Sequence, residues 1–175
     1  MVNSKRGQIW VETVLYTLIA FILISLVLSI ARPKIEEIRD NAILEQTAET
    51  MRGFDNLIRS PEFLDAGNKR EIELGLKKGY LKIDGINNQL AFEMECGSEF
   101  SEPGQDVADG NLILHTRQVG EVYHVNMTID YDSAYDFTIN GENETKQLGA
   151  SSIPYTIFIT NKGGSDKTVI DFEIN

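Results

Sequence analysis

The sequence predicts an α+β protein. A long N-terminal α-helix, hydrophobic in its first half and amphipathic in its second, precedes a β-rich, sandwich-like head domain. Two observations lead to this prediction. Near the N-terminus, residues 13–31 form a run of nineteen uncharged residues. Beyond Gly67, the apolar residues change from the 3.6-residue period of a helix to the alternation of β-strands. The 175 residues suffice for one anchor and one modest domain.

The uncharged run has the length of a membrane-spanning helix. As a helix it reaches about 28 Å, close to the roughly 30 Å hydrocarbon core of a bilayer. The run contains neither Pro nor Gly and is apolar on every face, so we expect it to be buried in a membrane or in a protein interior. Arg32-Pro33-Lys34 follows. Because Pro33 removes a helix hydrogen bond, we expect it to kink the helix or to restart it.

The residues leave three interpretations of this segment open. It is a plain signal-anchor, a secretory signal peptide cut after Ser29-Ile30-Ala31, or a helix preceded by a short cleaved leader. The second would need an apolar region far longer than the usual ~7–15 residues. For the third, Lys5-Arg6-Gly7 is followed by Gln8-Ile9-Trp10-Val11-Glu12. This order resembles the class III signal of archaeal type IV pilins, in which a basic leader ends in Gly, cleavage falls just before the hydrophobic helix, and Glu is the fifth mature residue.

The resemblance covers residues 5–12 and the apolar helix, and it implies a domain organisation. A membrane prepilin peptidase would act beside Lys5 and Arg6 and cut between Gly7 and Gln8. The chain would then consist of a class III leader peptide (1–7), a hydrophobic transmembrane and filament-core helix (8–31), an amphipathic extension of that helix (32–66) and a β-rich extracellular head domain (67–175).

The resemblance also implies a structural function. The subunit would lie in the cell membrane before assembly. The pilus assembly machinery would then pack it with copies of itself, through the N-terminal helices, into an extracellular filament at the cell surface, with adhesion as a role of the whole filament. Glu12 would pair with the α-amine of Gln8 in a neighbouring subunit and set the register of assembly. Alternatively, Glu12 lies among lipid headgroups, where a carboxylate in the first helical turn is also favourable.

A second function remains open beside the filament subunit. The chain would then be a membrane-tethered surface binding module, or a minor pilin or pilus accessory protein, that does not polymerise by itself. Loss of filaments on substitution of Glu12 or Gly7, with membrane insertion intact, would separate the two functions.

Residues 34–59 are predicted to extend the helix with one apolar stripe. Apolar residues recur at spacings of three and four between charged ones, so we expect the stripe to pack on the head domain. Its members are Ile35, Ile38, Ala42, Ile43, Thr47, Met51, Phe54 and Ile58. Ser60 and Pro61 then have the residue types preferred at the N-cap and the first position of a helix, which predicts a short turn that Gly67 closes.

The rest of the chain is predicted to form about nine short strands. A three-stranded meander through Leu74, Leu81 and Phe92 comes first, followed by a loop at Gly97–Asp109. Asn140-Gly141 and residues 162–166 carry hairpin-turn signals. The further expected strands are Asn111–Arg117, Glu121–Asp132, Asp136–Asn140, Lys146–Leu148, Pro154–Thr160 and Lys167–Ile174. A β-sandwich or rolled sheet packed on the amphipathic helix accommodates this pattern.

Charge and cysteine content restrict the partners of the head. Residues 79–175 carry 5 basic and 16 acidic side chains and so hold the entire net charge of −11. Such a domain repels nucleic acid and anionic headgroups, so neither is an expected partner. Cys96 is the single cysteine, which excludes an intramolecular disulfide. Asn126-Met127-Thr128 and Asn143-Glu144-Thr145 are glycosylation sequons, and Asn143 is the better candidate because it lies in a predicted turn.

Patterns typical of enzymes are sparse. No Gly-rich phosphate loop and no nucleophile turn is present. His115 and His124 lie on predicted strands that could bring them together across a hairpin, yet a metal site would need further ligands. We therefore expect no catalytic activity, no cofactor and no metal beyond one weak candidate.

That candidate is a calcium site at the acidic stretch around residues 130–136. Asp130, Asp132 and Asp136 alternate with residues whose carbonyls could complete a calcium shell. The stretch lacks the Gly and the final Glu of an EF-hand loop, and aspartates that flank a turn are the alternative explanation. Nearby aromatic residues could form an exposed patch for adhesion, or could belong partly to the core. These residues are Tyr123, Tyr131, Tyr135 and Phe137.

Overall fold

The computed structural model describes the backbone of residues 4–174 and the side chains of residues 10–174. It confirms the α+β fold: one long helix, α1 (Ser4–Ile58), is followed by ten strands in two sheets. The chain forms two compact units, Met1–Arg39 and Asp40–Asn175, so α1 begins in the first and ends in the second. α1 continues through Pro33, so the expected restart of the helix at this proline is wrong.

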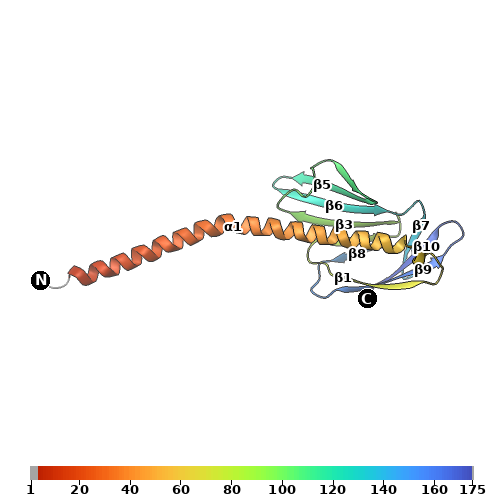
Figure 1. The fold of residues 1–175 in the computed structure, drawn as a ribbon, viewed down its shortest axis with the longest axis horizontal. Coiled ribbons are helices and arrows are strands. Elements are labelled where there is room, and N and C mark those ends of the chain that lie inside the picture. The colour runs from red at the N-terminus through yellow and green to blue at the C-terminus, as the bar shows by residue number, and fades with distance from the viewer. Residues whose placement is uncertain (1–3, 175) are drawn as a thin grey trace. The chain divides into compact units, whose positions relative to one another are not determined.

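The second unit has a two-sheet architecture (Figure 1). A four-stranded sheet has the order β1-β9-β10-β7 and a six-stranded sheet has the order β4-β5-β6-β3-β2-β8. The strands are β1 (Lys69–Leu74), β2 (Tyr80–Asp84), β3 (Gln89–Cys96), β4 (Asp106–Asp109), β5 (Leu112–Val119), β6 (Val122–Asp130), β7 (Tyr135–Ile139), β8 (Thr145–Gly149), β9 (Tyr155–Gly163) and β10 (Thr168–Ile174). Every pair is antiparallel except β7 with β10, which is parallel.

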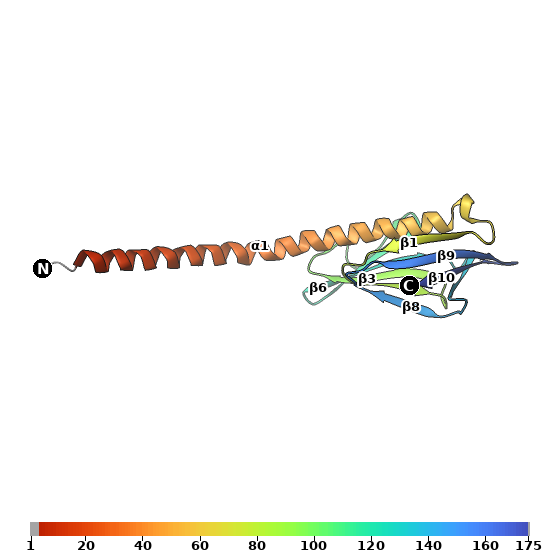
Figure 2. The ribbon, with the colours of Figure 1, turned by 90° about the horizontal axis from the view of Figure 1, so that it is seen from below.

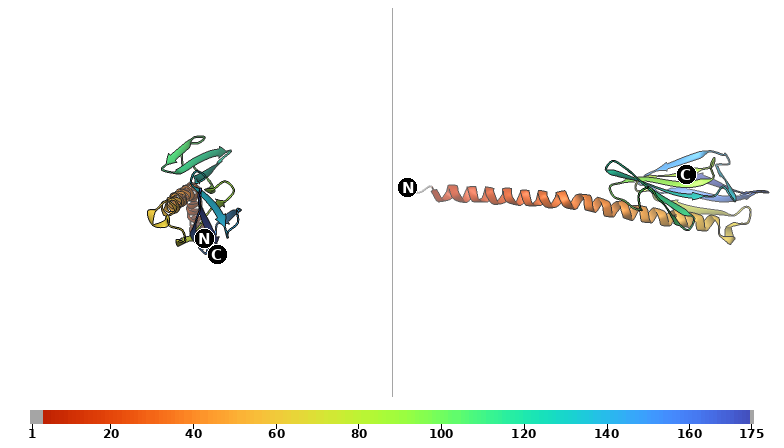
Figure 3. Two further views of the ribbon diagram at one scale, coloured as in Figure 1. Left: turned by 90° about the vertical axis from the view of Figure 1, so that its right-hand side faces the viewer. Right: turned by 90° about the horizontal axis from the view of Figure 1, so that it is seen from above.

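A single hydrophobic core joins both sheets to the end of α1. Figures 2 and 3 show residues 40–58 of the helix running along the strands of this unit. Phe54 and Ile58 from the helix, Phe92 and Met127 from the larger sheet, and Phe172 from the smaller one are all fully buried. Because these side chains come from every layer, no layer of this unit buries its apolar face alone.

The apolar stripe of the helix is narrower than expected and in a slightly different phase. Leu44 and Ala48 are buried together with Met51, Phe54 and Ile58. Ile35 and Ile38 lie before this unit begins and are 58% and 61% exposed. The spacing is right, but packing against the sheets selects which of the neighbouring positions enters the core.

The segment after α1 folds as a short 3₁₀ turn, as predicted. η1 (Pro61–Phe63) has Ser60 at its N-cap with an extended backbone, and Gly67 follows with a φ of 93°. The Ser60 side chain, however, donates to the Leu57 carbonyl oxygen at 2.9 Å and makes no capping bond. The turn is therefore set by Pro61, whose fixed φ suits the first position, more than by the serine.

Long-range pairing overturns parts of the predicted strand order. β2 and β3 form a hairpin, but β1 pairs with β9 and takes no part in a meander. The Asn140-Gly141 turn exists, with φ values of 53° and 84°. The strands on either side nevertheless enter different sheets, because β7 pairs with β10 and β8 with β2. β4 lies inside the predicted loop Gly97–Asp109, whereas the β9–β10 hairpin is confirmed.

Candidate functional site

The N-terminal apolar segment is the first candidate site. Every residue from Trp10 to Ile30 is exposed, and Trp10, Phe21 and Ile30 are each exposed by 69% or more. Within the described residues, α1 is the one helix long and apolar enough to cross a membrane. An apolar surface of this extent is unfavourable in water, so lipid or protein has to cover it.

The predicted processing residues lie at the start of this helix. The backbone of residues 5–8 is helical, but the side chains of Lys5, Arg6 and Gln8 lie outside the described ones, and cleavage at Gly7 stays a prediction. Glu12 lies one turn further along α1, at the head of the apolar segment. Its role in assembly is likewise a prediction.

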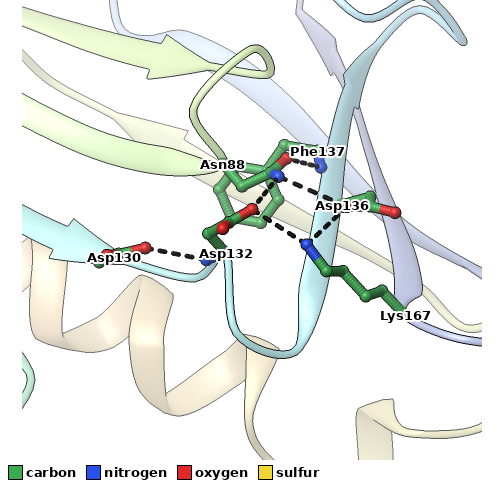
Figure 4. A network of polar contacts seen from close by, with 6 residues as sticks. All are labelled: Asn88, Asp130, Asp132, Asp136, Phe137 and Lys167. Atoms are coloured by element: carbon green, nitrogen blue, oxygen red, sulfur yellow. Dashed lines mark hydrogen bonds and ion pairs between the residues drawn. The ribbon is translucent and has the colours of Figure 1, made fainter.

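The acidic stretch at residues 130–136 forms a polar network that joins three turns (Figure 4). The Asn88 amide donates to the Asp132 carboxylate at 2.8 Å and to the Asp136 carboxylate at 3.4 Å. The Lys167 ammonium group lies 3.0 Å from Asp132 and 3.5 Å from Asp136. The hydrogen bonds from Asn88 and then from Lys167 lower the pKa of Asp132.

A single cation, Lys167, already lies between two of the three carboxylates at the proposed calcium site. Asp130 is turned toward its own strand end, where its Oδ1 accepts from the Asp132 backbone N–H at 2.9 Å. Among the side chains that the structure describes, no three acidic, His or Cys groups converge as metal ligands would. Calcium binding stays a prediction, and an entering ion would have to displace the Lys167 ammonium group from the two carboxylates.

Of the two interpretations of the aromatic residues, membership of the core is confirmed and the exposed patch is excluded. Tyr131 and Phe137 are fully buried, Tyr135 is 8% exposed and Tyr123 is half-buried. The Tyr131 and Phe137 rings are in contact at 4.9 Å between centroids. The Arg59 guanidinium stacks 5.1 Å from the Tyr131 ring centre and donates to Asp55 at 2.7 Å. These aromatic residues therefore join the end of α1 to the core rather than offering a surface.

The outer face of the six-stranded sheet carries a groove that the sequence did not reveal. It has a volume of about 730 Å³ and runs over β2, β3, β6 and β5. Cross-strand pairing builds two rows of polar side chains on its floor. The first row is Tyr80, Glu93, Asn126 and His115, and the second row is Glu95, His124 and Arg117.

Hydrogen bonds and ion pairs hold several of these groups in place. The Tyr80 hydroxyl donates to the Glu93 carboxylate, and this bond raises the pKa of Tyr80 to about 12. His115 Nδ1 lies 2.6 Å from the Asp106 carboxylate, and His124 Nδ1 lies 3.7 Å from that of Glu95. The two histidines are thus not opposite each other, since Asn126 faces His115 and Arg117 faces His124.

Gly79 explains how the groove's edge is shaped. Its φ of 75° is in the left-handed region, and a Cβ there would collide with the Glu93 backbone oxygen and the Phe92 ring. Only glycine therefore lets the start of β2 approach β3 this closely.

The two sequons lie in different surroundings. Asn143 is exposed in the turn between β7 and β8, as predicted. Asn126 is half-buried within β6, where its Oδ1 accepts from the Thr128 hydroxyl at 2.9 Å. Of the two, Asn143 is accessible to a glycosylating enzyme in the folded protein.

Comparisons of the chain with protein-family models, with curated proteins and with solved structures found no match. The long apolar N-terminal helix followed by a β-rich domain is compatible with a pilin-like fold.

Proposed function

We propose that this protein is a structural subunit of an extracellular filament of the type IV pilus kind, which polymerises through residues 8–31. The observation that supports the proposal is the exposed apolar surface from Trp10 to Ile30. Each large apolar side chain gains about 1.5–3 kcal/mol on burial. A bilayer would cover this surface before assembly, and neighbouring copies of the same helix would cover it afterwards.

The position of Glu12 favours a filament over a plain anchor. A carboxylate carried to mid-bilayer costs about 2.5–3.5 kcal/mol, and less near the interface. Cleavage after Gly7 would create an α-amine on Gln8, which could neutralise Glu12 of a neighbouring subunit. A head-to-tail contact of this kind produces an open helical filament when the rotation between subunits does not close into a ring.

The proposed partners follow from this sequence of processing and assembly. A prepilin peptidase would remove residues 1–7, and an assembly machinery would move the subunit from the cell membrane into the filament. The acidic head would remain outside the filament core, where its net charge keeps neighbouring heads soluble.

One observation supports the alternative, a membrane-tethered binding module. The head has its own closed core, with residues from α1 and both sheets buried, and it carries a polar groove on its surface. A domain of this kind can act as a single tethered copy, for example as a minor or accessory pilin.

The first experiment is the intact mass of the protein recovered from native cell envelopes. A chain that begins at Gln8 supports the filament subunit. A chain that begins at Met1 or Val2 favours the tethered module, and one that begins at Arg32 contradicts both functions.

A second experiment separates assembly from insertion. Glu12→Ala should abolish filaments in electron micrographs while the protein stays in the membrane fraction. Glu45→Ala is the matched control, since Glu45 is exposed on the same helix outside the apolar segment. Filaments that persist with Glu12→Ala would overturn the proposed role of Glu12.

A further inference from the structure

The groove on the outer face of the six-stranded sheet has two glutamates on one strand and an arginine two strands away. Glu93 and Glu95 lie on β3, whereas His115 and Arg117 lie on β5, with β6 between them. Neighbouring strands are about 4.8 Å apart, so the two sides are about 10 Å apart. Lys78, at the β2 side of the groove, pairs with Asp40, and His115 lies beside Asp106. The charges that remain separated across the strands are those of the two glutamates and of Arg117.

Several polar groups in the groove are left for a ligand. Among the described residues, the Arg117 guanidinium makes no hydrogen bond or ion pair, although the head around it is strongly acidic. Asn126 uses its Oδ1 for Thr128 and keeps its NH₂ group. Glu93 uses one carboxylate oxygen for Tyr80 and keeps the other. The floor thus offers unused donors on one side and an unused acceptor on the other.

The shape and chemistry of the groove favour a hydroxylated ligand. Sites for apolar small molecules are mostly lined by hydrophobic side chains and enclose the ligand. This groove is open along one face, and its floor combines apolar surface with carboxylates, imidazoles, a phenol, an amide and a guanidinium. The guanidinium offers paired donors, while the amide keeps a donor group and the carboxylate keeps an acceptor, and these groups suit the hydroxyls of a sugar ring. The flat faces of Tyr80 and the imidazoles suit the C–H surface of the same ring.

The charges restrict the ligand further. Arg117 can form a paired, charge-assisted bond to one carboxylate. The net charge of −11 on residues 79–175, which form most of the groove and most of the head, repels a polyanion. From these observations we infer that the groove binds a short carbohydrate that bears a single carboxylate, with the carboxylate at Arg117 and the hydroxyls at Glu93 and Asn126.

The three strands of the floor pair in continuous antiparallel register, so their side chains keep fixed spacings. A rigid floor loses little conformational entropy on binding. This site belongs to the head alone and does not depend on whether the protein polymerises.

Isothermal titration calorimetry on the full chain in detergent micelles tests the inference. The probes are cellobiouronic acid and cellobiose, which differ in one carboxylate, together with acetate. We expect saturable binding of cellobiouronic acid, at least about tenfold tighter than that of cellobiose, or about 1.4 kcal/mol. Acetate should give no saturable binding, because it lacks the hydroxyls.

Two variants and a control locate the site. Arg117→Gln should bring the two disaccharides to within about twofold of each other, because it removes only the contact to the carboxylate. Glu93→Gln should weaken both disaccharides. Arg70→Gln is the matched control: Arg70 is exposed on β1 in the other sheet, and its loss changes the charge of the head equally. Unchanged melting temperatures would show that each variant is folded.

Three outcomes would overturn the inference. The first is that neither disaccharide gives saturable binding, and the second is that acetate binds as tightly as cellobiouronic acid. The third is that Arg117→Gln still prefers cellobiouronic acid to cellobiose. The second would mean a site for any carboxylate, and the third would mean that the sugar binds elsewhere.

Discussion

The two units of this protein use the same kinds of apolar side chains in opposite ways. In the first, the leucines, isoleucines and aromatic residues from Trp10 to Ile30 are all exposed. In the second, Ile83, Leu90 and Phe92 are fully buried in one core. The head therefore carries its own stabilising contacts, whereas the apolar segment depends on lipid or on other chains. Substitutions in the two units should have separable effects.

The largest expected effect is the loss of an aromatic side chain from the head core. Phe137 is 1% exposed and contacts the rings of Tyr131 and Phe172. Phe137→Ala should lower the free energy of unfolding by about 3–5 kcal/mol, since it leaves a cavity. Thermal melting followed by circular dichroism measures this. Phe21→Ala, at a site 69% exposed, is the matched control and should leave the melting temperature of the head unchanged. If both variants lost the same stability, the two units would not be independent in this respect.

A charge in the middle of the apolar segment should act on the other unit alone. Ile22→Arg should disfavour membrane insertion by about 2.5–3.5 kcal/mol. The inserted fraction can be measured by glycosylation mapping in microsomes, with Ile22→Leu as the control. The head should melt as before. Unchanged insertion of the Arg variant would contradict a membrane-spanning role for this segment.

A smaller effect is expected at the turn that precedes β3. Asn88 has a φ of 51°, and its side-chain oxygen accepts from the buried Phe137 N–H at 2.8 Å. Asn88→Gly keeps the left-handed backbone but loses this bond and those to Asp132 and Asp136, and should cost about 1–3 kcal/mol. Asn88→Ala should cost about 1 kcal/mol more, because its Cβ disfavours that backbone. Chemical denaturation would measure the stability of both variants. An Ala variant as stable as the Gly variant would show that the left-handed backbone at residue 88 does not disfavour a Cβ.

The smallest effect concerns the acid stability of the head. Burial raises the pKa of Asp84, but hydrogen bonds from Lys82, Asn87 and Thr145 outweigh it and hold the pKa well below the usual value. A lowered pKa in the folded state means that the carboxylate stabilises the head above about pH 4. This contribution is lost as the pH falls through the folded pKa.

Asp84→Asn should therefore cost about 1–2 kcal/mol at neutral pH, and the difference from the unsubstituted protein should shrink on acidification. Denaturant unfolding at pH 7, 5 and 3 measures it. Asp166→Asn is the control, since Asp166 is exposed in the β9–β10 turn. A difference that stays constant with pH would show that the charge of Asp84 does not contribute.

Local features of the fold were predictable, and long-range partners were not. Pro61 and Gly67 act within a few residues, so their turn followed directly from residue type. The alternation in residues 69–74 indicates a strand, but it holds no information that the partner is β9. Asn140-Gly141 encodes a reversal of the chain, yet whether the two flanking strands pair depends on the sheets that receive them.

The same limit applies to the candidate sites. The clustering of Asp132 and Asp136 could be read from the sequence, but their cation, Lys167, comes from a distant turn. Glu93 and Arg117 occupy outward positions of strands that look like any solvent-facing side, and only the register of β3, β6 and β5 places them in one groove. The apolar segment was predictable because its uncharged, apolar residues follow one another without interruption in the sequence.

The strand order also dictates when this protein can fold. β10 lies in the interior of its sheet, between β9 and β7, and β1 joins this sheet only by pairing with β9. The four-stranded sheet therefore cannot close until residues 168–174 have left the ribosome, and pairings so distant along the chain form slowly. The apolar helix is synthesised much earlier. It therefore leaves the ribosome while the head is still unfolded, so insertion of this helix into a membrane would precede folding of the head.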